Sequence, residues 1–429
     1  MLRVFIFLLS LVIVTTTYSG TAATTAPTRN WYDQFIFKDP SFTFELIRTL
    51  GYTYEKGADI GESISTAKKI TDEDFTSWYQ EWTKTANRIE SLAQKATTKG
   101  NTITARNAFL RAANYYRTAG FYMVSPTNRP QSIATYRLSH KAFLHAIESL
   151  PYINAINIPY EQTTLPGYFV RSDKTNAPLV IVNTGFDGTA EELYFEVGAA
   201  LHERGYNCLL VEGPGQGGAL RTQNLHFRHD WENVVGPIID YAETLPDTDK
   251  NKIALMGISM GGYLAPRAAA FEPRIKAVIA NGGVYDFGEA AYKTLPPDLI
   301  KMIDDDPAAF DKMMIEGMKK NTIVRWFYEN GMWSFGVTTP AAFMKKIKLY
   351  TLKDVAQSIK MPTLVVDSES DLFMGGQARA LYNHLTGSKT FLLFTKQEAA
   401  ESHCQMGATA ISNERILDWL DDTLDYHAS

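Results

Sequence analysis

A serine flanked by glycines, in the stretch Gly257-Ile-Ser-Met-Gly261, carries the clearest chemical signal in this sequence. An apolar run over 252–256 precedes it, and a small-residue segment of helical character over 262–270 follows it. A Gly-x-Ser-x-Gly motif between a strand and a helix is typical of a nucleophile elbow, because the glycines let the chain reverse sharply and expose the hydroxyl. A helix that starts beside Ser259 would also favour the negative charge of acyl transfer. The motif predicts a nucleophilic serine; the plainer interpretation is a Gly/Ser loop that closes a βα unit.

A serine hydroxyl is a poor nucleophile without a general base, and the base needs an orienting acid. In one common order of such triads along the chain, the serine comes first, the acid second and the histidine last. Three of the eight histidines follow Ser259. His384 lies in a helical pattern and His427 lies two residues from the end, whereas His403 lies in a polar stretch after the last predicted strand. We therefore predict that His403 is the base.

The acid should stand where a strand ends and reach the histidine. A strand predicted over 362–367 runs into Ser368-Glu-Ser-Asp371. Asp371 lies in the turn beyond the strand, so we predict Asp371 as the acid and keep Glu369 as the alternative. The plainer interpretation is that these carboxylates only cap the next helix.

A tetrahedral intermediate needs two backbone amides that stabilise its oxyanion. One should be the amide of Met260, directly after the nucleophile. The other should come from the loop Thr184–Gly188, which follows the strand predicted over 179–183. Phe186 is the predicted donor, because Gly185 lets the chain turn this amide inward.

One motif points to a different chemistry. Gly213-Pro-Gly-Gln-Gly-Gly218 follows a strand and formally matches the dinucleotide-binding pattern G-x-G-x-x-G. Pro214 removes an amide from such a phosphate cradle, and no clear helix is expected to start at Gly218. We predict a tight βα turn that borders the active site. No Walker, His-Glu-x-x-His or paired-cysteine motif is present, so neither a cofactor nor a metal is expected.

The elements that must position these residues change type along the chain. Helical patterns fill 30–151, where Phe75, Trp78, Tyr79 and Trp82 recur at helix spacing and are expected to be core. Helices then alternate with β-rich runs, which favours a mainly parallel sheet whose strands end at the site. The expected strands cover 154–159, 179–183, 207–212, 253–256, 275–280, 363–367 and 391–394. The segment 287–352 has helix signals only and is predicted to be an insertion; its Asp304–Asp306 run is expected to cap a helix rather than bind calcium.

Composition limits the function classes. The chain has 429 residues, 45% of them hydrophobic, and a net charge of −5, which gives no reason to expect nucleic acid as a partner. The two cysteines imply no disulfide framework. Residues 1–23 read as a signal peptide, with an apolar core too short to span a bilayer, so we expect a secreted or periplasmic protein with no membrane span after cleavage. An uncleaved anchor is the alternative, and a homodimer stays open.

Several motifs together resemble one group of the α/β-hydrolase superfamily. They are Asn183–Glu192, Glu212–Gly217, Gly257–Gly262, Asp367–Asp371 and Glu401–Cys404, and Ala113–Arg117 resembles that group's N-terminal cap. The group contains 2,6-dihydroxypseudooxynicotine hydrolase and the fungal pigment hydrolases that shorten polyketide chains. The resemblance implies a triad at Ser259, Asp371 and His403, and cleavage of carbon–carbon bonds next to ketones; many relatives are called esterases or peptidases.

The sequence therefore predicts an α/β-hydrolase with a signal peptide (1–23), an N-terminal helical cap domain (30–151) and a catalytic domain (152–429) that contains the helical insertion (287–352). We expect a serine hydrolase that forms an acyl-enzyme on a small ester or ketone. Two alternatives stay open. One is an exopeptidase of the prolyl-oligopeptidase type, although no propeller repeat precedes the catalytic domain. The other is a non-catalytic binding protein on the same fold.

Overall fold

The computed structural model describes residues 30–427 except residue 34, and the predicted signal peptide over 1–23 lies outside the described residues. At its centre is one eight-stranded sheet with the order β1-β2-β4-β3-β5-β6-β7-β8. Strands β3 to β8 pair in parallel, and β1 and β2 add an antiparallel pair at the side of β4. The strands are β1 (Ile153–Tyr160), β2 (Thr163–Val170), β3 (Ala177–Asn183), β4 (Asn207–Val211), β5 (Thr248–Ile258), β6 (Ala277–Asn281), β7 (Thr363–Ser368) and β8 (Lys389–Phe394).

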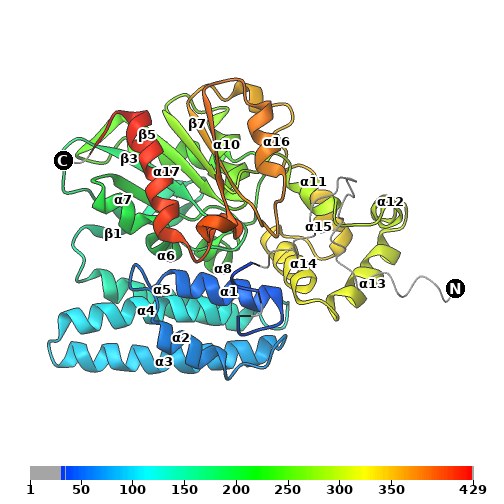
Figure 1. Cartoon of the computed structure of the whole chain (residues 1–429), viewed down its shortest axis with the longest axis horizontal. Helices are drawn as coiled ribbons and strands as arrows, with labels where there is room; N and C mark the ends of the chain where they lie inside the picture. The colour runs from blue at the N-terminus through cyan, green and yellow to red at the C-terminus, as the bar shows by residue number, and fades with distance from the viewer. Residues whose placement is uncertain (1–29, 34, 428–429) are drawn as a thin grey trace.

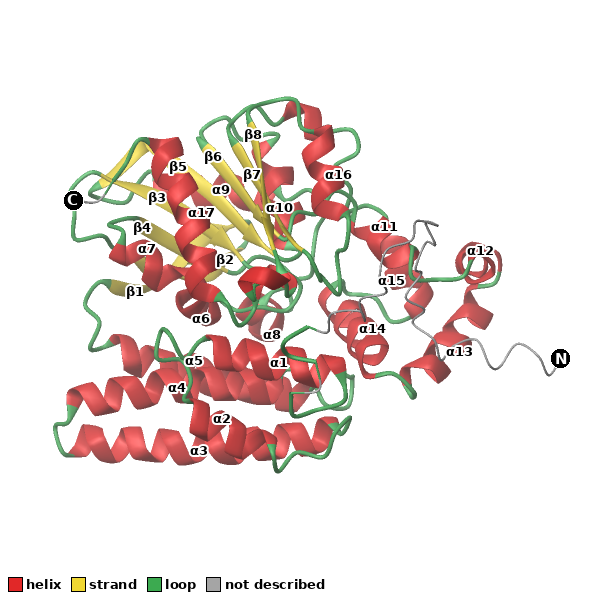
Figure 2. Cartoon of the chain, in the orientation of Figure 1, coloured by secondary structure: helices red, strands yellow, loops and turns green. Residues whose placement is uncertain are grey.

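Helices cover both faces of the sheet, as the near-continuous apolar strands require. Leu179 to Val182 in β3 have no exposed surface. Figure 2 shows α17 in front of the strands, with α9 and α10 behind them. The helices of this layer are α6 (Ala190–Leu193), α7 (Ala199–Glu203), α8 (Gly217–Gln223), α9 (Glu232–Ala242), α10 (Gly261–Ala269), α16 (Gln377–His384) and α17 (Thr409–Leu424). The predicted mainly parallel α/β sheet is confirmed.

Strand β2 was not expected from the sequence. Its segment contains Pro166 and Gly167, which are both unfavourable inside a strand. The structure accommodates them between β1 and β4, where the paired segment of β2 and β4 begins at Gly167 and the carbonyl of Pro166 accepts a hydrogen bond from the Glu212 amide. A side chain on Gly167 would have its Cβ 2.5 Å from the carbonyl oxygen of Leu210, so the glycine permits the close approach of β4.

Five helices precede the sheet and lie along one side of it (Figure 1). They are α1 (Pro40–Gly51), α2 (Ile60–Ala67), α3 (Phe75–Thr98), α4 (Thr102–Gly120) and α5 (Arg129–Ile147). The aromatic residues of α3 pack inward, with Trp78 and Trp82 fully buried and Tyr79 half-buried. The Trp78 indole donates a hydrogen bond to the carbonyl of Thr118, so its polar atom is satisfied inside the core. This aromatic face is core, as predicted.

A second helical group interrupts the sheet between β6 and β7, as predicted, and extends to one side of it (Figure 1). It consists of α11 (Phe287–Tyr292), α12 (Pro297–Asp305), α13 (Pro307–Met318), α14 (Thr322–Ser334) and α15 (Pro340–Ile347). A bridge between Asp286 and Thr351 joins the two ends of this insertion at its base. Asp306 caps α13 by accepting the amide hydrogen of Ala309, as predicted for this acidic run, and Asp304 pairs with Lys345 at 3.3 Å. No helix of the described residues is long and apolar enough to cross a membrane.

Candidate active site

Ser259 lies at a strained turn between β5 and α10. Its φ angle is +61°, a left-handed conformation that few non-glycine residues adopt. A Cβ on Gly257 would lie 1.9 Å from the Gly261 carbonyl oxygen, so the turn excludes any side chain at position 257. The Ser259 amide donates to the carbonyl of Asn281 at the end of β6, which anchors the turn to the sheet. The serine side chain is half-exposed, whereas its neighbours Ile258 and Met260 are buried.

His403 and Asp371 meet this serine from two later connections. The Nε2 atom of His403 lies 2.8 Å from the Ser259 hydroxyl oxygen, and its Nδ1 lies 2.7 Å from Oδ2 of Asp371. The other carboxylate oxygen of Asp371 accepts two amide hydrogens, from Phe373 and Met374, each at 2.8 Å. Because both carboxylate oxygens are engaged, the carboxylate is held in one orientation toward the imidazole. The structure therefore brings the three predicted side chains together.

The other candidates lie elsewhere. Glu369 is exposed and accepts the amide hydrogen of Lys396, away from the imidazole. The His384 ring bonds the carbonyl of Ala380 on its own helix, and exposed His427 lies 3.8 Å from Asp422. Among the described residues, neither Glu369, the alternative acid, nor His384 and His427, which were not predicted as the base, forms a hydrogen bond with Ser259 or His403.

The electrostatics of the pair fit a base held by an acid. Burial by itself lowers the pKa of His403, but the Asp371 carboxylate opposes it, and the net pKa lies well above the ordinary value of 6.5. For Asp371, burial raises the pKa, and the imidazole together with the two amides lowers it, so the net pKa lies below 3.8. The negative charge of Asp371 thus stabilises a protonated imidazole, which is the form His403 takes after it accepts a proton.

The predicted oxyanion donors lie beside this serine. A Cβ on Gly185 would lie 2.8 Å from Cβ of Ser259 and 3.0 Å from the Met260 amide nitrogen, so the two loops touch. Among the hydrogen bonds of the described residues, neither the Phe186 amide nor the Met260 amide donates to any acceptor. Two unpartnered amides next to a serine hydroxyl are the arrangement that an oxyanion requires.

Two residues that the sequence did not single out hold this loop. The side-chain amide of Gln216 donates to the carbonyls of Thr184 and Gly185, at 2.8 and 2.9 Å. The side-chain amide of Asn330, in α14, donates to the carbonyl of Phe186 at 3.2 Å. No local sequence signal could have identified Asn330, because it lies 144 residues from its partner.

The turn that contains Gln216 corrects one expectation. A helix, α8, does start at Gly217, although none was expected there. Its start is stabilised by the carboxylate of Glu212, which accepts the Gly218 amide hydrogen in place of a local cap. A Cβ on Gly217 would lie 1.8 Å from Oε1 of Glu212, so this carboxylate fills the space of the supposed phosphate cradle. The rejection of a dinucleotide site therefore has a structural reason.

Aromatic rings contact the imidazole and the loop Thr184–Gly188, which we call the oxyanion loop. The ring centroid of Phe373 lies 5.0 Å from that of His403, and Phe44 of α1 lies 6.3 Å from it. On the other side, Trp326 of the insertion packs edge-on against Phe186 at 5.6 Å. The walls of the site thus come from the N-terminal helices, the insertion and the sheet connections together.

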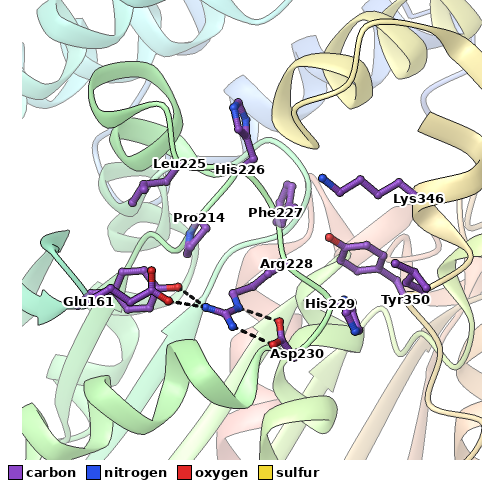
Figure 3. Close-up of a pocket in the computed structure, with 12 residues that line it drawn as sticks. Glu161, Pro214, Leu225, His226, Phe227, Arg228, His229, Asp230, Lys346 and Tyr350 are labelled. Atoms are coloured by element: carbon purple, nitrogen blue, oxygen red, sulfur yellow. Dashed lines mark hydrogen bonds and ion pairs between the residues drawn. The ribbon is translucent and has the colours of Figure 1, made fainter. Parts of the chain in front are cut away.

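A separate pocket of about 390 Å³ is lined in part by Pro214 of the Gly213–Gly218 turn (Figure 3). Its Arg228 is paired with Glu161 and Asp230, each at 2.7 Å. Its Lys346 donates to the carbonyl of Phe335. None of the predicted site residues lines this pocket, so it is distinct from the serine site.

The described residues contain no cluster of three or more His, Cys, Asp or Glu side chains that could hold a metal ion. Both cysteines are free and buried, which agrees with the prediction that they form no disulfide framework. Cys404 lies next to His403, with its sulfur 3.4 Å from Nε2 of the imidazole.

Comparisons with known proteins agree with this architecture. The family described as esterase FrsA-like matches residues 72–290. Hydrolase LUC6 from Fusarium sp is 32% identical over 412 residues, which cover 90% of this chain and 97% of that protein. The 20-hydroxy-prefusarin hydrolase FUS2 of Gibberella moniliformis is 33% identical with the same coverages. The solved structure of 2,6-dihydroxy-pseudo-oxynicotine hydrolase covers 89% of this chain and 97% of its own, with a TM-score of 0.68 at 19% identity.

Proposed function

We propose, since the chain belongs to the FrsA-like esterase family of α/β-hydrolases, that it cleaves a small carbonyl substrate with Ser259 as nucleophile. The observation that carries this proposal is the unbroken chain of contacts from the Ser259 hydroxyl through the His403 ring to the Asp371 carboxylate, at 2.8 and 2.7 Å. A scaffold without activity would have no need for this alignment at a strained turn.

In the acylation step, Nε2 of His403 accepts the hydroxyl proton while Ser259 attacks the carbonyl carbon. The imidazole becomes positively charged and is stabilised by Asp371, which holds its Nδ1–H. The carbonyl oxygen becomes an oxyanion and accepts hydrogen bonds from the amides of Phe186 and Met260. Because these amides have no other acceptor among the described residues, they need not give up a hydrogen bond before they bind the charge.

The tetrahedral intermediate then collapses, and His403 donates its proton to the leaving group. This group is an alkoxide if the substrate is an ester, or an enolate carbon if the bond is a carbon–carbon bond next to a ketone. Water, deprotonated by the same imidazole, then attacks the acyl-enzyme and releases the acid. One set of residues therefore serves both reactions, and the leaving group distinguishes them.

The surroundings of the site favour an aromatic or conjugated substrate. Phe44 and Phe373 pack against the His403 ring, and Trp326 packs against Phe186, so aromatic side chains, which bind flat apolar molecules well, gather around the site. The relatives named above are hydrolases, and one of them is named for 20-hydroxy-prefusarin. We propose a small acyl or ketone substrate rather than a polymer, because helices on two sides restrict the access.

The first test is covalent labelling with a fluorophosphonate, followed by peptide mass spectrometry. We expect one adduct, on Ser259, and its absence in Ser259→Ala. This variant should also lose turnover by up to roughly a millionfold, because the triad acts as a unit. An adduct on another serine, or full activity in the alanine variant, would refute the assignment.

The second test distinguishes the bond that is cleaved. Aryl esters, β-diketones and aminoacyl anilides are compared by kcat/KM on the unlabelled protein, from a preparation that reacts with the fluorophosphonate. Fast cleavage of diketones with slow ester hydrolysis supports the carbon–carbon reaction, and the reverse supports an esterase. Turnover of anilides alone would indicate a peptidase and would contradict the proposed substrate class.

A further inference from the structure

Three consecutive carbonyls of the loop after β3 are held by side-chain amides from distant parts of the chain. Gln216 binds the carbonyls of Thr184 and Gly185, and Asn330 binds that of Phe186. A loop of this kind would otherwise leave buried carbonyls unsatisfied, which is costly. The contact to Gly185 has a second consequence, because this carbonyl belongs to the same peptide plane as the Phe186 amide.

In a trans peptide, the C=O and the N–H point in opposite directions from one plane. A donor that fixes the Gly185 carbonyl on one side of the loop therefore directs the Phe186 N–H to the other side. Gly185 itself packs against the serine turn, where a Cβ on it would approach Cβ of Ser259 and the Met260 amide nitrogen. The Phe186 amide has no acceptor among the described residues, so the carbonyl contact at 2.9 Å is what orients its peptide.

We propose that Gln216 is a positioning residue of the oxyanion hole: its carboxamide fixes the Gly185–Phe186 peptide so that the Phe186 amide faces the carbonyl under attack. The inference rests on the proposed function, since it assigns a role to a residue that does not touch the substrate. It gives the Gly213–Gly218 turn a task in catalysis that the sequence did not indicate.

Gln216 is itself held in one position. Its side chain is fully buried, and its Oε1 accepts the Gly213 amide hydrogen at 2.8 Å. The two hydrogens of its Nε2 serve the two carbonyls, so every polar atom of the carboxamide is used. A glutamine suits this task because it offers one acceptor and two donors. A protonated glutamate has only one donor, and an ionised one has none, so Gln216→Glu can hold at most one of the two carbonyls.

The test compares Gln216→Leu and Gln216→Glu with the matched control Asn207→Leu. Asn207 is also a fully buried amide that donates to loop atoms, the Asp247 carbonyl and the Thr248 hydroxyl, but at the opposite ends of the strands. Kinetics use the aryl ester with the highest turnover. Affinity is measured for an aryl trifluoromethyl ketone, which adds to the serine and places an oxyanion in the hole, and for the unfluorinated ketone, which does not.

We expect kcat to fall by roughly 10- to 100-fold in Gln216→Leu, less than for complete loss of an oxyanion donor, and KM to change by less than about threefold. Affinity for the trifluoromethyl ketone should fall with kcat, whereas the unfluorinated ketone should bind as before. Gln216→Glu should lie between wild type and Gln216→Leu. Asn207→Leu should keep the wild-type kcat and both affinities even if its thermal stability is lower.

Equal losses for both ketones, or a kcat of wild-type size in Gln216→Glu and Gln216→Leu, would overturn the inference. If Gln216→Leu does not fold, Gln216→Glu decides, because it keeps the contact to the Gly213 amide. Failure of the proposed function is seen separately, since the wild-type protein would then show neither a fluorophosphonate adduct nor ester turnover.

Discussion

At the scale of single residues, the hydrogen bonds of each carboxylate decide which one can reach the imidazole. Asp371 uses one oxygen for two backbone amides and the other for the imidazole. Glu369, two residues earlier, is directed to the amide of Lys396 instead. The choice between two neighbouring carboxylates is therefore made by the turn after β7, which presents one of them to His403 and the other to solvent.

The pH dependence of activity follows from this pair. The general base must be neutral in the free enzyme, so kcat/KM should fall as the pH drops through the pKa of His403, which lies above 6.5. Asp371→Asn should reduce kcat by roughly 10⁴-fold, because the orienting carboxylate is lost. The acid limb of its residual activity should move to lower pH, because burial alone lowers the pKa of the imidazole.

The measurement is a pH–rate profile of kcat/KM for the wild-type protein and the variant. Glu369→Gln serves as the control, since it removes the neighbouring acid without touching the imidazole. An acid limb that shifts in Glu369→Gln and not in Asp371→Asn would reverse the assignment of the acid.

At the scale of elements, buried ion pairs connect the N-terminal helices to the sheet connections. Arg48 of α1 contacts Glu192 of α6 at 2.6 Å and Asp187 at 3.1 Å. Asp187 follows Phe186 directly, and Glu192 lies in α6. Arg48 therefore connects α1 to both ends of the segment 187–192. Arg117 of α4 adds a contact to Glu192 at 3.5 Å. The position of α1 and that of the loop are thus coupled.

Arg48→Met should lower the free energy of unfolding at pH 7 by about 3–5 kcal/mol, because it removes the nearer of the two arginines from buried Glu192 and the partner of Asp187. Burial alone would raise the pKa of Glu192, but Arg117 and Arg48 lower it to about 2. A lowered folded-state pKa gives stability that is present above the ordinary pKa of 4.5 and is lost as the pH falls toward 2. The difference in unfolding free energy between Arg48→Met and the wild-type protein should therefore become smaller as the pH falls through this range.

Denaturant unfolding at several pH values checks this expectation. Arg415→Met is the matched control, since its pair with Glu398, at 2.6 Å, is about one third exposed on both sides. Exposed pairs contribute only about 0–1 kcal/mol. Equal losses of stability in the two variants would contradict the importance of the buried connection.

At the scale of the whole molecule, the sheet connections, the N-terminal helices and the insertion come together near the carboxyl ends of the parallel strands (Figure 1). The residues predicted as oxyanion donor, nucleophile, acid and base follow the carboxyl ends of the parallel strands β3, β5, β7 and β8. The N-terminal helices contribute Phe44, and the insertion contributes Trp326 and Asn330. The residues around the candidate site therefore come from all three groups.

Export is a prediction for the chain as a whole, and it rests on the sequence of residues 1–23 alone. We expect the protein purified from its natural source to lack this segment and to occur outside the cytoplasm. Intact-mass measurement together with N-terminal peptide sequencing checks it. A chain that retains Met1 and stays with the cytoplasmic fraction would contradict it.

The sequence by itself determined the local features of this protein. The Ser259 elbow, seven of the eight strands and the aromatic face of α3 depend on residues within a few positions of one another, so pattern and turn chemistry were enough. Strand β2 and helix α8 were missed because their stability is not local. Gly167 makes room for β4, and Glu212 satisfies the start of α8 from the preceding strand.

Only the tertiary structure decided which distant groups meet. Asp371 rather than Glu369 faces the imidazole, and Gln216 and Asn330 hold the carbonyls of a loop that lies 31 to 144 residues away in the chain. Such contacts leave no periodicity in the sequence, because one amide or carboxylate can satisfy any carbonyl or amide that folding brings within reach. The types of the reacting groups could therefore be predicted from short motifs. The orientation of these groups depends on how separate helices and loops pack around one end of the sheet.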